Sequence, residues 1–151
     1  MIIKNFQINR GKVRGAIAVE MALFMIPLIV LAFGAAEFGR AIFEYNTLAK
    51  SARDGVRHVS QSPATDTLKT EAIQLTVYGT TTGTTPEPLL PNLNESMVVI
   101  TEAVDAATGI NMVTVTITGY TFNFVFNPLV FFGNTTTSIT FDDIHATMRQ
   151  L

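Results

Sequence analysis

Glu20 is the residue whose type and position have the clearest chemical consequence. Residues 16–36 carry no other charge and are largely apolar, so this carboxylate lies inside a candidate membrane span. An ionised carboxylate left unpaired in hydrocarbon costs several kcal/mol, which makes such a residue a functional candidate. The simpler interpretation is that Glu20 lies near the membrane surface and extends its carboxylate toward water. The two interpretations differ in whether Glu20 needs a cationic partner.

The other side chains capable of chemistry form no catalytic or metal-binding pattern. The chain has two histidines, His58 and His145, and no cysteine, so the usual zinc ligand sets cannot be assembled. Asp142 and Asp143 are adjacent on a predicted strand, where successive side chains point to opposite faces and not to one calcium ion. No glycine-rich phosphate loop follows a strand, and no nucleophile elbow is recognisable. We therefore predict no enzyme activity, cofactor or metal.

Residues 16–36 have the length of a membrane-spanning helix. As an α-helix these 21 residues would rise about 31 Å, which matches the hydrocarbon core of a bilayer. Residues 1–15 form a basic leader without any acid; its charged residues are Lys4, Arg10, Lys12 and Arg14. Positive charge before a span favours a cytoplasmic N-terminus, so residues 37–151 are predicted to lie outside.

The charge of the exported part excludes one class of partner. The chain has 10 basic and 12 acidic residues. The leader holds four of the basic ones, which leaves six basic against twelve acidic residues beyond it. A nucleic-acid-binding domain carries the opposite sign, so we predict no nucleic-acid partner. Without cysteine, no disulfide stabilises the exported part.

A single helix is predicted to continue past the span. Helix signals run from residue 16 to 59, interrupted by Pro27, which a membrane helix tolerates, usually with a kink. Beyond residue 36 the apolar positions recur at steps of four and three; they are Phe38, Ile42, Tyr45, Ala49, Ala52, Val56 and Val59. We predict that this seam packs against a sheet, with contact to a partner protein as the alternative.

Charged residues fill the remaining positions of this amphipathic segment. The spacing of Glu37 and Glu44 from Arg40, and of Lys50 from Asp54, predicts ion pairs worth a few tenths of a kcal/mol each. The arginines, with Arg53 and Arg57 among them, are assigned to a solvated face. Gly39 and Gly55 either allow a second helix to approach or are simply tolerated.

The rest of the chain predicts a small α+β domain. Ser62-Pro63 ends the rod, and a second helix is predicted from Thr65, a suitable N-cap, to Tyr78. Its expected buried face is Leu68, Ala72 and Leu75. Residues 80–93 are polar and rich in Thr and Pro, which predicts a loop.

Alternating residues in the last third predict three or four antiparallel strands. These strands cover residues 97–104, 112–118, 120–127 and 138–148. Gly119 is a candidate bend, and Ile139, Phe141 and Ile144 are expected to point inward. Strands packed on the amphipathic helix give an α+β fold with a short second helix.

The order of features along the N-terminal half resembles a known family. A basic leader, Gly15, Glu20 five residues later and an apolar helix are similar to the class III signal of type IV prepilins. Several blocks resemble the TadE-like family of minor pilins and pseudopilins of tight-adherence (Tad/Flp) pili; they are Ala18-Val19-Glu20-Met21-Ala22-Leu23, Pro27-Leu28, Glu37-Phe38-Gly39-Arg40-Ala41, Ala52-Arg53-Asp54-Gly55-Val56-Arg57 and Ala146-Thr147-Met148-Arg149. The firm likeness covers residues 13–60.

This resemblance implies a processing step and an assembly contact. A prepilin peptidase would cut between Gly15 and Ala16, removing the leader and keeping residues 16–36 as a transmembrane and assembly helix. Glu20 would then pair with the new N-terminal amine of a neighbouring subunit. Because desolvation offsets much of the attraction, such a pair would fix the register between neighbouring subunits more than it would stabilise their association.

The same resemblance implies partners and a location. The partners would be the prepilin peptidase, other pilins or pseudopilins, the Tad assembly machinery and membrane lipid. The location would be the bacterial inner membrane or a pilus, with residues 37–151 as an extracytoplasmic, pilin-like domain. Two alternatives remain open: an uncleaved envelope protein with an outward binding domain, and a secreted module cut by an ordinary signal peptidase after Gly34 or Ala36.

Overall fold

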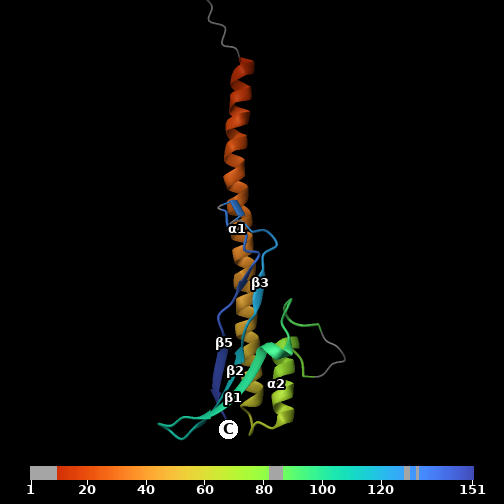
Figure 1. Cartoon of the computed structure of the whole chain (residues 1–151), viewed down its shortest axis with the longest axis vertical. Coiled ribbons are helices and arrows are strands. Elements are labelled where there is room, and N and C mark those ends of the chain that lie inside the picture. The colour runs from red at the N-terminus through yellow and green to blue at the C-terminus, as the bar shows by residue number, and fades with distance from the viewer. Residues whose placement is uncertain (1–9, 82–86, 128–129, 132) are drawn as a thin grey trace, which may run out of the picture.

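The long helix predicted from the sequence is a single element, α1, from Arg10 to Val59. The computed structural model describes residues 10–81, 87–127, 130–131 and 133–151; residues 1–9 of the leader and 82–86 of the predicted loop lie outside them. Helix α1 has 50 residues, which correspond to a length of about 75 Å. The helix continues through Pro27, and Figure 1 shows it as one rod along the longest axis of the molecule.

A second helix, α2, lies beside the C-terminal part of α1 and runs from Asp66 to Tyr78. The hydroxyl of Thr65 accepts a hydrogen bond from the Leu68 amide, and Gly79 ends the helix in the left-handed conformation at φ 73°. Both ends are therefore where the capping residues predict them. The buried face differs in part, because it consists of Ala72, Thr76 and Val77.

Three antiparallel strands pack on these helices in the order β1-β2-β5. Their bounds are Val98–Val104 for β1, Asn111–Ile117 for β2 and Ile144–Arg149 for β5, with the short 3-10 turn η1, Glu95–Met97, before β1. In β2 the Val and Ile side chains point inward and the Thr side chains outward, as the alternation predicts. The backbone amide of Leu151 donates to the Ser60 carbonyl at 3.0 Å, which ties the C-terminus to the end of α1.

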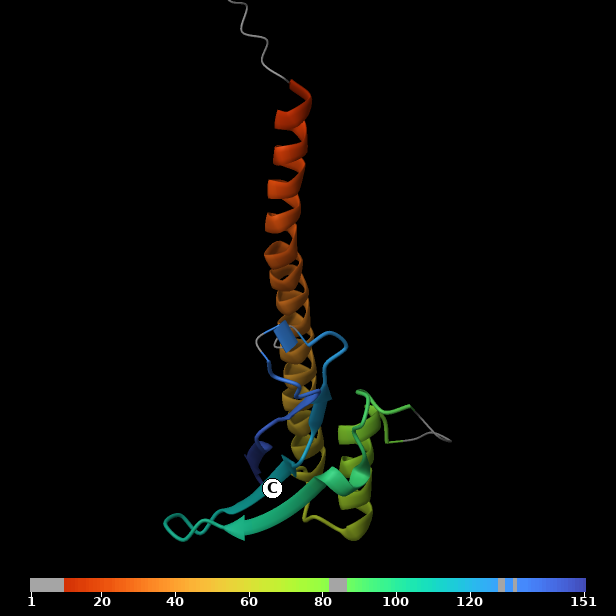
Figure 2. The same cartoon turned by 45° about the horizontal axis from the view of Figure 1, so that its top comes forward.

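A second, two-stranded sheet leaves this domain and follows α1 toward its N-terminal end. It pairs β3, Thr121–Asn123, with β4, Ser138–Thr140, and we call residues 120–140 the arm (Figures 1 and 2). Gly119, at φ 69°, is the predicted bend between β2 and the arm. The single strand predicted over 138–148 is wrong, because residues 141–143 separate β4 from β5 and the two belong to different sheets. Ile139 is accordingly exposed, although Ile144 is buried as expected.

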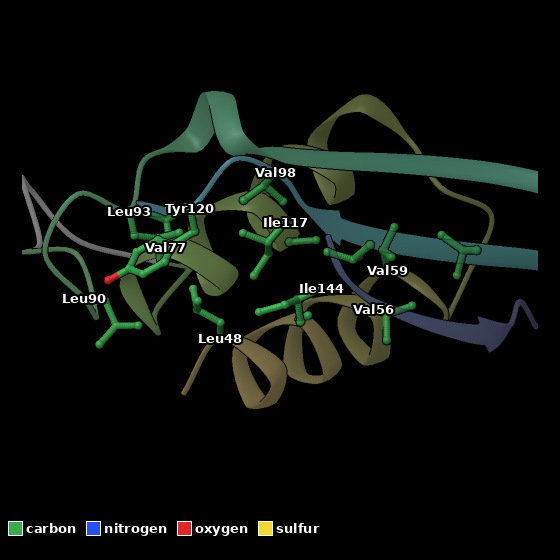
Figure 3. Packing of buried hydrophobic residues seen from close by; sticks show 14 residues of the cluster. Leu48, Val56, Val59, Val77, Leu90, Leu93, Val98, Ile117, Tyr120 and Ile144 are labelled. Carbon is green, nitrogen blue, oxygen red and sulfur yellow. The ribbon is translucent and has the colours of Figure 1, made fainter. Parts of the chain in front are cut away.

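The hydrophobic core lies between the last third of α1, α2 and the three-stranded sheet (Figure 3). Helix α1 contributes Leu48, Ala52, Val56 and Val59, and the sheet contributes residues such as Val115. The loop before η1 adds two fully packed leucines; they are Leu90 and Leu93. The core contribution of α1 therefore begins at Leu48, and the part of α1 before that residue is covered mainly by the arm.

Candidate functional site

The first part of α1 is exposed along nearly its whole length. Side chains from Ile17 to Phe33 make few contacts within the chain, and Glu20 is exposed among them. The helix has one stretch long and apolar enough to cross a membrane, and none of that stretch is buried by the rest of the protein. An added Cβ at Gly15 would meet nothing within 4 Å, so the Gly15–Ala16 peptide lies in open space. By its length and composition, this exposed apolar segment is suited to anchor the protein in a membrane.

Immediately after the span, three charged residues of α1 turn toward the arm. The guanidinium of Arg40 pairs with Glu37 at 2.7 Å and with Glu44 at 3.2 Å, which confirms both predicted ion pairs. Both carboxylates are buried, and a third of the Arg40 side chain is exposed. We call Glu37, Arg40 and Glu44 the clasp. The assignment of Arg40 to a solvated face is therefore wrong, because the arm covers this side of the helix.

The clasp binds the arm through its backbone and through one tyrosine. Arg40 donates to the Asn123 carbonyl, and the Val125 amide donates to Glu37 at 3.3 Å. The Tyr120 hydroxyl donates to Glu44 at 2.8 Å and also contacts the Pro91 carbonyl at 3.0 Å. The Arg40 guanidinium stacks over the Phe122 ring, at 4.3 Å from its centre.

These contacts set the protonation states within the clasp. Burial raises the pKa of the Glu37 carboxyl, but the hydrogen bonds from Arg40 and from the Val125 amide outweigh it, so the pKa lies below its usual value. Burial and the hydrogen bond to Glu44 raise the pKa of the Tyr120 hydroxyl well above its usual value. At neutral pH the clasp therefore holds an ionised Glu37 and a protonated Tyr120 that donates.

The arm also contacts α1 on the membrane side of the clasp, through the rings of Phe33 and Phe126. Their ring centres are 4.8 Å apart. With the clasp, the positions of α1 that the arm contacts are 33, 37, 40 and 44, which are four, three and four residues apart. Such spacing places them on one face of a helix. The arm therefore contacts one face of α1 from the end of the span to the core.

The apolar seam predicted for this part of α1 is wrong in its first half. Ala52, Val56 and Val59 are fully buried, but Phe38, Ile42 and Tyr45 are exposed. Tyr45 makes one edge contact, to the Phe141 ring. The physical reason is that the arm packs on the clasp, so the charged face turns inward and the apolar face is left outside.

The exposed apolar face is aligned with Glu20. Glu20 and Phe38 are separated by about five helical turns, so their side chains leave the helix in nearly the same direction. We call this line of exposed side chains the outer stripe; it consists of Glu20, Phe24, Leu31, Phe38, Ile42 and Tyr45. It is about 37 Å long and lies about 130° around the helix from the face that the arm covers.

The other residues singled out by the family resemblance have separate surroundings. An added Cβ at Gly39 would meet nothing within 4 Å, whereas Gly55 faces Thr76 and Ala72 of α2 at close range. Gly55 is therefore the glycine that allows a second helix to approach. Arg53 and Arg57 are exposed, as predicted. Within the described part of the chain, Lys50 and Asp54 form no ion pair.

The sequence did not indicate which residues the clasp would bind. Tyr120, Asn123 and Val125 lie about 80 residues from their partners on α1, and no local spacing connects them. One signal was available, because residues 120–140 contain no Asp, Glu, Lys, Arg or His. Across the described ranges, no group of three His, Asp or Glu side chains gathers as a metal site would require.

The comparison with protein families supports the resemblance. The TadE-like protein family matches residues 15–57. That segment contains the whole outer stripe and the whole clasp, and it ends before α2 and the sheet. Neither the curated proteins nor the solved structures contain a match to this chain. Through residues 15–57, the chain is similar to TadE-like proteins, and this match points to a protein associated with a Tad pilus.

Proposed function

We propose that this protein is a minor pilin or pseudopilin that assists assembly of a Tad/Flp-type adhesion pilus. The observation that carries the proposal is the outer stripe. A helix face with six exposed side chains, continuous from the span into the head, suits packing against the helices of other subunits. The stripe is free because the arm lies on another face of the same helix.

In this proposal a prepilin peptidase cleaves the chain after Gly15. Cleavage removes the basic leader and creates an α-amino group on Ala16. Glu20 lies about 6 Å along the helix from that residue and belongs to the outer stripe. In an assembled filament its carboxylate pairs with the amine of a neighbouring subunit and sets the register between them. The partners are then the peptidase, other pilins and the Tad machinery, reached from the inner membrane.

Processing predicts a mature chain that begins at Ala16. The expected result is that the intact mass of the membrane-bound form, and its N-terminal sequence, start at that residue. Replacing Gly15 by Val should block cleavage, because a branched side chain crowds the scissile amide. A chain that retains Met1 would contradict processing and favour an uncleaved envelope protein. A soluble product starting near Ala35 would instead favour an ordinary signal peptidase.

The assembly role predicts that substitutions on the outer stripe impair pilus formation but not membrane insertion. Glu20→Ala should insert normally and reduce the amount of protein in sheared pili. Phe38→Ala should do the same, and Phe43→Ala is the matched control. The two phenylalanines are 69% and 66% exposed, but Phe43 lies about 130° away from the stripe. Equal effects of the two substitutions, or normal assembly of Glu20→Ala, would contradict this role.

A further inference from the structure

We propose that the tip of the arm is a second membrane contact, which rests on the lipid surface beside the point where α1 leaves the bilayer. We define the tip by its described apolar residues, Val125, Phe126, Val130 and Phe131. This proposal requires only the membrane span of α1. It depends neither on cleavage after Gly15 nor on a role in pili, so it can fail or succeed independently of both.

The position of the tip places it at the level of the membrane surface. The Phe126 ring meets the Phe33 ring at 4.8 Å. Phe33 belongs to the span and lies three residues before its end at residue 36, which is about 4.5 Å along the helix axis. Figures 1 and 2 show the arm extending alongside α1 from β3 toward the N-terminal half of that helix. A side chain that touches Phe33 is therefore within reach of the lipid that surrounds it.

The exposed surface of the tip is apolar and uncharged. Val125 is 84% exposed, and Val130 and Phe131 are 56% and 60% exposed. The Phe131 ring contacts the Phe126 ring at 6.3 Å, so the exposed side chains continue the aromatic contact with Phe33. The whole arm contains no Asp, Glu, Lys, Arg or His. Apolar side chains such as Phe and Leu insert at the boundary between the headgroups and the acyl chains of a bilayer.

The clasp holds the tip in this orientation. The Val125 amide donates to Glu37, and the Asn123 carbonyl accepts from Arg40, so the backbone that leads into the tip is fixed to the first turns of α1 beyond the span. Polar residues of the arm next to the tip, such as Asn134 and Thr136, are also exposed. Their presence sets the depth of the contact at the headgroup region, because an unpaired amide is costly in hydrocarbon.

Lipid is the occupant that the surroundings favour. The tip is continuous with the apolar surface of the span, which itself faces lipid before any assembly. A second protein would have to cover the tip and Phe33 together, and the outer stripe proposed for subunit contacts lies about 130° around the helix from this face. The tip therefore meets the bilayer on the side of α1 that carries the clasp.

Site-directed fluorescence in a defined bilayer tests the proposal. The chain has no cysteine, so Val125→Cys and Val130→Cys each accept a single environment-sensitive NBD label. Val104→Cys, at an exposed position of β1 far from the tip, is the control. The labelled full chains are placed one copy per phosphatidylcholine nanodisc. A nitroxide on the lipid chains near the headgroups and aqueous iodide serve as quenchers.

The expected result is that labels at Val125 and Val130 emit at shorter wavelength and are quenched mainly by the lipid nitroxide. The control label should be quenched mainly by iodide. Iodide-dominated quenching at both tip positions would overturn the proposal. It would equally be overturned if tip labels became protected only when several copies share one disc, because the occupant would then be protein. Two label positions guard against one substitution disturbing the arm.

Discussion

Gly55→Ala is expected to destabilise the fold by about 1–3 kcal/mol, the usual cost of overpacking a well-packed interior. A Cβ at this position would overlap the Thr76 hydroxyl and lie 3.2 Å from the Ala72 carbonyl oxygen of α2. The Thr76 hydroxyl cannot turn away freely, because it is buried and donates to Ala72 at 2.7 Å. Helices α1 and α2 would have to separate. Denaturant unfolding of the detergent-solubilised chain measures the loss.

Two further variants separate crowding from other effects of the new methyl group. Gly39→Ala adds the same methyl on the same helix in open space, so it should be neutral or stabilise by up to about 1 kcal/mol through helix propensity. Thr76→Ala removes the atom that meets the new Cβ. In that background Gly55→Ala should cost clearly less than in the wild type. If Gly55→Ala behaves like Gly39→Ala, the close approach of the two helices is refuted.

Arg40→Met is expected to release the arm from α1. The substitution leaves the buried carboxylates of Glu37 and Glu44 facing the arm without their cation. Breaking a fully buried pair costs about 3–5 kcal/mol, and the partial exposure of Arg40 lowers the expected cost to about 1–3 kcal/mol. Hydrogen exchange should show faster exchange of the Val125 and Phe124 amides, while amides of β2 change little.

A control and a pH series make this prediction specific to the clasp. Arg53→Met removes an exposed arginine of the same helix and should change stability by less than about 0.5 kcal/mol. In the wild type the pKa of Glu37 is lowered, so its stabilising effect is present above its unfolded pKa and is lost as the pH falls below that value. In Arg40→Met, the cation that lowers this pKa is absent, so Glu37 contributes less pH-dependent stability. The difference in unfolding free energy between the wild type and Arg40→Met should therefore shrink as the pH is lowered. A difference that stays constant with pH would contradict the ion pair between Arg40 and Glu37.

The elements that sequence predicted well are those with strong local signals. Thr65 and Gly79 mark the ends of α2 because capping acts within one helical turn. The Val-Thr alternation identifies β2 because one face of that strand is buried. The family match also rests on local blocks in residues 15–57.

The inward face of α1 could not be predicted from the same information. Helical periodicity identifies an apolar face but not what covers it. It therefore predicts that Phe38 and Ile42 are packed in the core, whereas both are exposed. The inward face is charged because the arm offers backbone donors and acceptors to Glu37 and Arg40. Those partners depend on tertiary contacts between distant parts of the chain.

The bracing of α1 by the arm has a mechanical consequence. A lone helix that leaves a bilayer can flex at the exit point, where it loses the support of lipid before it gains that of a domain. Here the arm runs across that point: Phe126 contacts Phe33 of the span, and Val125, Asn123 and Tyr120 form hydrogen bonds with the clasp in the turns that follow. The segment of α1 around the end of the span is therefore more rigid than a helix without such contacts. A rotation of the membrane end of α1, or its translation along the helix axis, is therefore passed to the C-terminal α+β domain with little loss to bending.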